Sequence, residues 1–155
     1  MPRKKLIKKS LTKSDFKYKN ILVALLINKF LKHGKKSLAK RIIYKTFIYI
    51  STKSSKNPLF IFEKAIKNIS PRIKLKINRV GGATYQVPIL LNIFNGINFA
   101  IRWLLQISKK RSEKQMYLKL GNEILDSAKG NSLSIKKKEE IYKIAKANQA
   151  FLDQE

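Results

Sequence analysis

Residues 72–91 have the sequence RIKLKINRVGGATYQVPILL, and this segment sets the architecture of the chain. Apolar residues alternate with Lys74 and Lys76 up to a pair of glycines, and a second extended segment follows. Such alternation is typical of a strand that turns one face to a core and the other to a partner. It predicts a basic β-hairpin with Lys74, Lys76 and Arg79 on its outer face. An isolated two-stranded ribbon has only marginal stability in water. We therefore interpret this hairpin as an arm that contacts the phosphate groups of a nucleic acid.

The rest of the chain is also strongly basic, but unevenly so. Its 155 residues include 35 Lys and Arg and only 9 Asp and Glu, which gives a net charge of +26. Residues 1–112 hold 27 of these cations with two acids, Asp15 and Glu63, whereas residues 113–155 are nearly neutral. Self-repulsion on this scale opposes a compact state unless a polyanion is bound. We therefore expect nucleic acid to meet the first two-thirds of the chain.

Helical patterns flank the hairpin on both sides, and 44% hydrophobic residues suffice for a folded core. Gly34 and Gly130 are expected as left-handed helix stops, Asn57-Pro58 as a helix start, and Ser112 with Gln115 as a capping box. The expected helices cover residues 20–31, about 35–50, 57–70, 95 or 96 to 111, 113–129, and 132 or 134 to 148, with a polar linker at 51–56.

The predicted fold class is mainly α: a six-helix bundle with a protruding β-hairpin between the third and fourth helices. A single helical domain is expected over residues 20–152, with the hairpin arm at about 72–91. Residues 1–19 are basic and poor in apolar side chains, so we expect a flexible N-terminal arm that orders on a partner.

Cations without nearby acids form the candidate interface. Lys35, Lys36, Lys40 and Arg41 make a patch, which fits phosphate contact better than a solvated turn. Lysines on an edge strand also serve simply to prevent aggregation. Tyr85 is equally consistent with packing against the bundle or the opposite strand and with stacking on a base. The candidate residues for contact with nucleic acid are Arg3, Lys4, Lys5, Lys8 and Lys9 of the arm; Lys35, Lys36, Lys40 and Arg41; Arg72, Lys74, Lys76, Arg79, Gly81, Gly82 and Tyr85 of the hairpin; and Arg102, Lys109, Lys110 and Arg111.

Other conspicuous residues indicate structure rather than chemistry. Trp103 is expected in the core with Arg102 pointing elsewhere, and Glu123 and Asp126 are expected as exposed helix charge. With no Cys and a single His, the sequence offers no thiolate zinc site or His pair, so we expect no metal, cofactor or enzyme activity. The chain starts without the apolar stretch of a secretory signal, and its longest apolar run, residues 21–27, is too short to span a bilayer.

Five separated motifs, in order, resemble the small-subunit ribosomal protein S-seven family. The resemblance extends from about residue 14 to 151 and is closest to plastid members, with bacterial members next. The motifs are LKHGKKSLA at 31–39, RVGGATYQVP at 79–88, IRW at 101–103, KKEE at 137–140 and AKANQAF at 145–151.

This resemblance implies a primary binder of small-subunit ribosomal RNA that organises the head, or 3′ major, domain. It also implies a fold made of a helical bundle with a hairpin arm. In that family the protein lies near the exit site, close to messenger and transfer RNA, and contacts the ribosomal protein S-eleven family. The implied location is a plastid (chloroplast) ribosome or, alternatively, the bacterial cytoplasm. The sequence departs from the family pattern at Phe16, where many relatives have proline, at Asn78, which replaces an arginine, and in the acidic tail 152–155.

Two other classes of protein would carry similar charge. An architectural DNA-binding protein is the alternative function, and competition between structured RNA and duplex DNA distinguishes the two. A basic amphipathic protein on an anionic membrane is a third interpretation, which needs liposome binding that survives high salt.

Overall fold

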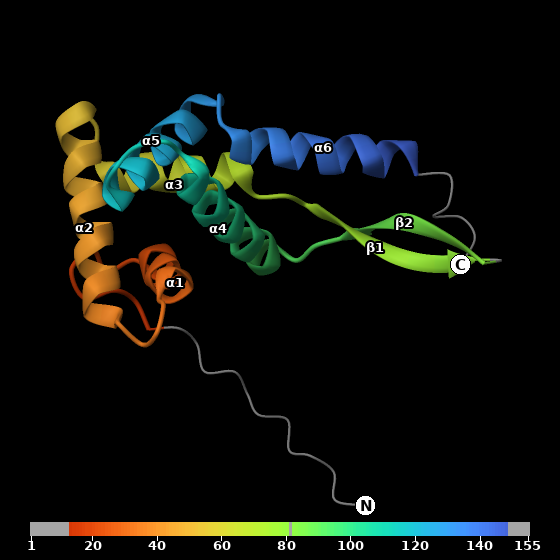
Figure 1. Cartoon of the computed structure of the whole chain (residues 1–155), viewed down its shortest axis with the longest axis horizontal. Helices are drawn as coiled ribbons and strands as arrows, with labels where there is room; N and C mark the ends of the chain where they lie inside the picture. The colour runs from red at the N-terminus through yellow and green to blue at the C-terminus, as the bar shows by residue number, and fades with distance from the viewer. Residues whose placement is uncertain (1–12, 81, 149–155) are drawn as a thin grey trace, which may run out of the picture.

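The computed structural model describes residues 13–80 and 82–148. Within these residues the chain forms six helices and one two-stranded antiparallel sheet (Figure 1). The elements are α1 (Ile21–Phe30), α2 (Lys36–Lys53), α3 (Pro58–Ile69), β1 (Ile73–Val80), β2 (Ala83–Leu90), α4 (Ile93–Lys110), α5 (Met116–Lys129) and α6 (Leu133–Ala147). The predicted fold class is therefore confirmed, including the place of the hairpin between α3 and α4.

Local signals in the sequence account for most of the helix ends. Asn20 and Asn57 cap α1 and α3, where their side-chain oxygens accept from the backbone N–H groups of Leu22 (2.7 Å) and Leu59 (3.0 Å). The proline after Asn57 takes the first position of α3, as predicted. Gly130 ends α5 with a φ of +96°, in the left-handed region that favours glycine.

Other helix boundaries differ from the prediction. α2 runs on to Lys53 through half of the expected linker, because polar residues without Gly or Pro do not stop a helix. α4 begins at Ile93 rather than at residue 95 or 96, since the extended residue Asn92 already lies at its N-cap. α1 ends at Phe30, so Gly34, with a φ of +71°, shapes the following turn instead of the helix end.

The predicted capping box of the fifth helix is wrong. α5 begins at Met116, and Gln115 at its N-cap makes no side-chain capping bond. Glu113 lies before the helix because its carboxylate accepts from the side chains of Arg111 (3.5 Å) and Asn122 (2.9 Å). A contact between two elements therefore overrides the local signal.

The core forms where α1 to α5 converge, with α5 packed on α2, α3 and α4. Phe47 and Phe62 meet edge to face inside it, with ring centroids 5.6 Å apart. Trp103 is buried, as predicted. Within residues 13–80 and 82–148, no helix combines the length and the hydrophobicity that a membrane-spanning helix needs.

The hairpin leaves this body and extends beside α6 (Figure 1). At its root the backbone N–H of Arg72 donates to the hydroxyl of Tyr142 (2.9 Å), and further out the side-chain amide of Asn148 donates to the carbonyl of Gln86 (3.0 Å). Gly96 lets α4 approach the hairpin root closely. A Cβ atom at this position would lie 2.6 Å from the backbone carbonyl oxygen of Pro71, in the loop between α3 and β1. The finger is therefore buttressed on one side by α6.

Residues 13–19 of the expected arm contact the body. The Asp15 carboxylate is buried and accepts from the backbone N–H groups of Lys17 and Tyr18 (3.2 Å each) and from the hydroxyl of Tyr44 (2.9 Å). The ring of Tyr18 packs on that of Phe47, with centroids 4.9 Å apart. Asp15 and Tyr18 thus fix this turn to α2, and residues 1–12 lie outside the described part.

Candidate nucleic-acid interface

The cationic face of the hairpin is set by the strand register. Lys74 pairs with Ile89 and Lys76 with Val87, and paired residues of antiparallel strands project to the same face. Both lysines are exposed, as predicted. The face that carries them is thus cationic along β1 and apolar along β2.

Arg79 lies on the opposite face, which corrects the prediction that it joins the two lysines. It differs from Lys74 and Lys76 by an odd number of positions in β1, so it shares the face of Leu75 and Ile77. Its side chain is exposed. The ribbon therefore offers cations on both faces.

The ribbon tip falls partly outside the described residues. Gly81 lies outside them, whereas Gly82 has a φ of +86° and joins the strands, as the predicted turn requires. Tyr85 is half-buried and pairs with Asn78 across the ribbon.

A second group of cations, the α2 patch, consists of Lys35, Lys36, Lys40 and Arg41. Lys35 occupies the N-cap of α2 without a side-chain capping bond, and Lys36 is its first residue. Lys40 is half-buried, and the other three are exposed. A cation at a helix N-terminus opposes the helix dipole, so these lysines cost the helix stability unless an anion is bound.

At the hairpin root, α6 adds cations that the sequence interpretation missed. The Lys138 ammonium donates to the carbonyl of Asn68 (2.8 Å) and lies 5.9 Å from the ring centroid of Tyr142. Burial lowers the pKa of Lys138, and the nearby charge of Arg72 lowers it further. We call Arg72, Lys138 and Tyr142 the root junction: two cations held close together there make a strongly positive site.

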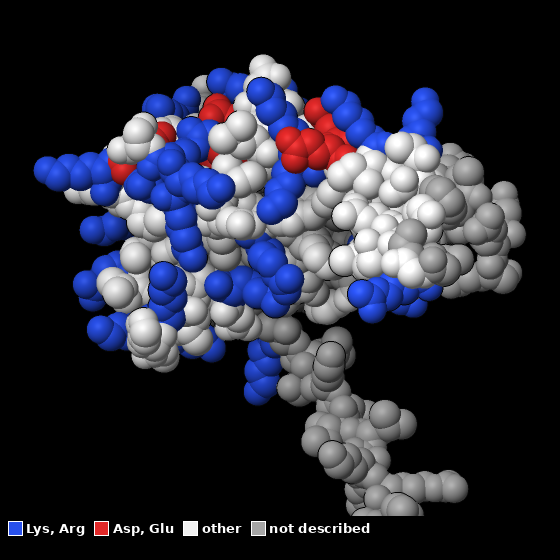
Figure 2. All heavy atoms as spheres, turned by 45° about the vertical axis from the view of Figure 1, so that its right-hand side comes forward, with Lys and Arg blue, Asp and Glu red and all other residues white. Residues whose placement is uncertain are grey.

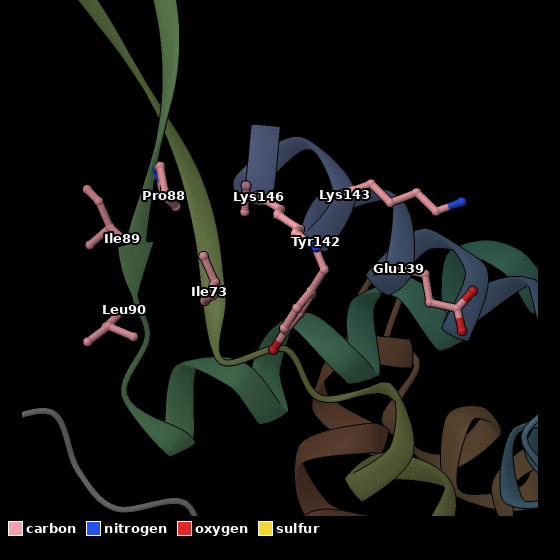
Figure 3. Close-up of a pocket in the computed structure, with 9 residues that line it drawn as sticks. Ile73, Pro88, Ile89, Leu90, Glu139, Tyr142, Lys143 and Lys146 are labelled. Atoms are coloured by element: carbon pink, nitrogen blue, oxygen red, sulfur yellow. The ribbon is translucent and has the colours of Figure 1, made fainter. Parts of the chain in front are cut away.

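A cleft of about 940 Å³ opens between the ribbon and α6. Figure 3 shows the Tyr142 ring pointing from α6 toward the hairpin root, while the Lys143 and Glu139 side chains point away from the ribbon. Tyr142, Ile73 and Pro88 give the cleft apolar walls. Its lining consists of Ile73, Pro88, Ile89, Leu90, Glu139, Tyr142, Lys143, Ala145 and Lys146. No local pattern in the sequence shows that α6 faces the ribbon, so this cleft was not predicted.

The end of α4 carries a third group of cations. Lys109 and Lys110 lie in its last turn and are exposed. Arg102 is also exposed and points away from the core, as predicted, with its guanidinium 5.5 Å from the ring centroid of Phe99. These three side chains are available to a polyanion.

Arg111, which was grouped with them, is instead bound within the protein. Its guanidinium pairs with Glu123 (Nε to Oε2, 2.8 Å), Glu113 (3.5 Å) and Asp126. We call these four residues the Arg111 cluster. Burial lowers the pKa of Arg111, but hydrogen bonds to Asp126 and Glu123 outweigh it, so that the pKa lies above its ordinary value. The prediction of Arg111 on the RNA face is corrected to a structural role.

The prediction of Glu123 as exposed charge is also wrong. Its side chain is fully buried, and Oε1 accepts from the hydroxyl of Ser134 (2.6 Å) on α6. Ser132 rather than Ser134 therefore caps α6, where it accepts from the N–H of Ile135 (3.3 Å). The cluster thus ties the end of α4 to α5 and α6.

The Arg111 cluster holds every ion pair within 4.0 Å in the described residues. The two acids of residues 1–112 have neutral partners, since Asp15 bonds to Tyr44 and Glu63 accepts from the side chain of Asn20 (2.7 Å). Figure 2 shows Lys and Arg over much of one face, with Asp and Glu confined to its upper part. Arg3, Lys4, Lys5, Lys8 and Lys9 lie outside the described residues.

The site as a whole offers cations, apolar walls and aromatic rings, but no cluster of metal-binding side chains. Residues 13–80 and 82–148 contain no group of three or more His, Cys, Asp or Glu that could hold a metal ion. Cations beside apolar walls and aromatic rings are the groups that contact phosphates and bases in nucleic-acid-binding proteins. A sequence model of the family described as Ribosomal protein S7p/S5e matches residues 2–149, which include all six helices and the hairpin.

Proposed function

Because the chain belongs to the ribosomal protein S7p/S5e family, and is therefore a small-subunit ribosomal protein that binds ribosomal RNA, we propose that it clamps the head of the small subunit. The clamp consists of the hairpin lysines, the α2 patch, the root junction and the end of α4. The family is structural rather than catalytic, in agreement with the absence of enzyme activity expected from the sequence.

One observation carries the proposal: outside the Arg111 cluster, the described Lys and Arg have no acid within 4.0 Å among the described residues. Their mutual repulsion opposes folding, and phosphates relieve it. A-form RNA presents a deep, narrow major groove, so recognition rests on backbone shape and on unpaired bases. A rigid body with a buttressed finger suits a junction where several RNA helices converge.

The finer placement is also a proposal. We place the protein in the 3′ major domain near the exit site, close to messenger and transfer RNA and in contact with the S-eleven family. We propose a plastid ribosome as its location, with the bacterial cytoplasm as the alternative. The motif resemblance supports both statements. Sedimentation of a cell lysate with antibody detection would test the ribosomal location, because it shows the subunit with which the protein travels.

Competition between nucleic acids tests the function itself. The protein is bound to a labelled fragment of head-domain ribosomal RNA at physiological salt and challenged with unlabelled RNA or duplex DNA of equal length. We expect the RNA to displace the label at a much lower concentration. Equal or better competition by duplex DNA would favour the architectural DNA-binding function instead.

A further inference from the structure

Phe16 is the most exposed large apolar side chain in the described residues, at 93%. It lies in the turn between Asp15 and Tyr18, before α1 begins. A single exposed apolar residue needs no explanation by itself. What distinguishes Phe16 is the way in which its neighbours are held.

Both sides of Phe16 are anchored to α2. The Asp15 carboxylate accepts two backbone N–H groups from the turn and the hydroxyl of Tyr44, and the backbone N–H of Lys19 donates to the carbonyl of Asp15 (2.9 Å). Tyr18 packs against Phe47 and Tyr44, with ring centroids 4.9 and 5.7 Å away. The backbone of the turn is thus fixed while its central ring stays in solvent, so covering the ring requires little further ordering of the backbone.

Cations lie on the turn itself and on the helix that holds it. The Lys17 ammonium lies 5.2 Å from the ring centroid of Tyr44 and 5.7 Å from that of Tyr18. Tyr44 lies one helical turn beyond Lys40 and Arg41, so the turn adjoins the α2 patch. The only acid in the turn, Asp15, is buried and already bonded. An anionic, aromatic ligand fits such a surface better than an apolar protein partner does.

We propose that Phe16 is a stacking site for an unpaired RNA base, with Lys17 and the α2 patch holding the phosphates on either side. The proposal rests on the ribosomal RNA binding proposed above and adds a contact at a position where the sequence departs from the family pattern. Stacking of a base on an exposed aromatic ring is tolerant of sequence. It also releases no counterions, which separates its effect from that of a lysine.

Substitutions test the site on the full chain with the head-domain RNA fragment. Phe16→Ala is expected to weaken binding about 5- to 150-fold, with the slope of log affinity against log salt unchanged, and Phe16→Tyr to retain most of the affinity. Phe60→Ala on α3 is the matched control, since Phe60 is also exposed, at 59%. Both alanine variants should melt within about 2 °C of the wild type, because surface truncations cost little.

Fluorescence provides a second measurement. In Phe16→Trp the new indole is expected to be quenched when RNA binds, beyond the change seen in the wild type, where the native Trp103 is buried. Equal affinity of Phe16→Ala and the wild type, or an equal loss in Phe60→Ala, would overturn the stacking site while leaving RNA binding intact. Failure of the wild type to bind the fragment would instead contradict the proposed function.

Discussion

The hairpin and the Arg111 cluster place the same kind of charge in opposite settings. Lys74 and Lys76 are exposed, and no described acid lies within 4.0 Å of them. The side chain of Arg111 is only 22% exposed and pairs with three acids, of which Glu123 is 1% exposed. One region therefore keeps its charge for a partner, whereas the other uses it to join helices.

The comparison shows that net charge alone does not mark a binding surface. A cation neutralised inside the fold contributes to stability, and its removal leaves buried acids without a partner. A cation without an internal partner contributes repulsion and remains available to phosphate.

The largest effect is expected from breaking the Arg111 cluster. Arg111→Met leaves the buried Glu123 carboxylate without its cation and should lower the free energy of unfolding by about 3 kcal/mol, the low end for a buried pair. For a chain of this length that corresponds to a melting temperature about 6 to 12 °C lower. Urea denaturation measures it, with the exposed Lys110→Met as the control. A loss in the control as large as that in Arg111→Met would contradict a structural role for the cluster.

A smaller effect, on binding rather than folding, is expected from the hairpin. Replacing Lys74, Lys76 and Arg79 with Ala should weaken binding to the RNA fragment about tenfold or more while the helical circular dichroism is unchanged. The matched control replaces three exposed lysines of the last third, Lys114, Lys129 and Lys136. A collapse of the helical signal in the hairpin variant would show that these side chains support the fold.

The Asp15–Tyr44 contact yields a pH-dependent effect within the cationic region. Burial, together with the hydrogen bond to Asp15, raises the pKa of Tyr44 to about 12. The folded protein thus keeps the phenol proton in a range where the unfolded chain loses it, so this contribution to stability is present below about pH 10 and lost between about pH 10 and 12. Tyr44→Phe should cost about 1 kcal/mol at neutral pH and show a shallower alkaline fall. Parallel pH profiles of the two proteins would contradict the assignment.

The smallest effect is expected at the start of α2, where RNA binding favours a positive charge and the stability of the helix favours a negative one. Lys36→Glu places an acid at the helix N-terminus and should stabilise the fold by about 0.5 kcal/mol through the helix dipole. The same change should weaken RNA binding, because it reverses one charge of the α2 patch. Thermal melting and RNA titration on one preparation measure both. Unchanged RNA affinity would remove Lys36 from the interface.

Local patterns were enough to predict the helix order and the hairpin. The alternation around Lys74, the caps at Asn57 and Ser132, and the stop at Gly130 depend on neighbouring residues only, and each occurs in the structure. The prediction that Trp103 lies in the core is also confirmed. These features follow from periodicity and backbone geometry, which a sequence displays directly.

What local patterns could not predict are contacts between elements that are distant in the sequence. Glu123 looked like surface charge because nothing near it shows that Arg111 and Ser134 converge on it. Lys138 on α6 reaches the hairpin root only in three dimensions. The start of α5 was also missed, because the Glu113 carboxylate accepts from the side chains of Asn122 and Arg111 and lies before the helix rather than in its first turn.

The salt dependence of RNA binding measures how many phosphates the unpaired cations neutralise. Log affinity is measured against log salt for the wild type, the hairpin triple variant and the triple variant of the last third. We predict a steep slope for the wild type, a slope shallower by about 2 to 3 for the hairpin variant, and no change for the other. A flat wild-type titration, or three equal slopes, would contradict the account.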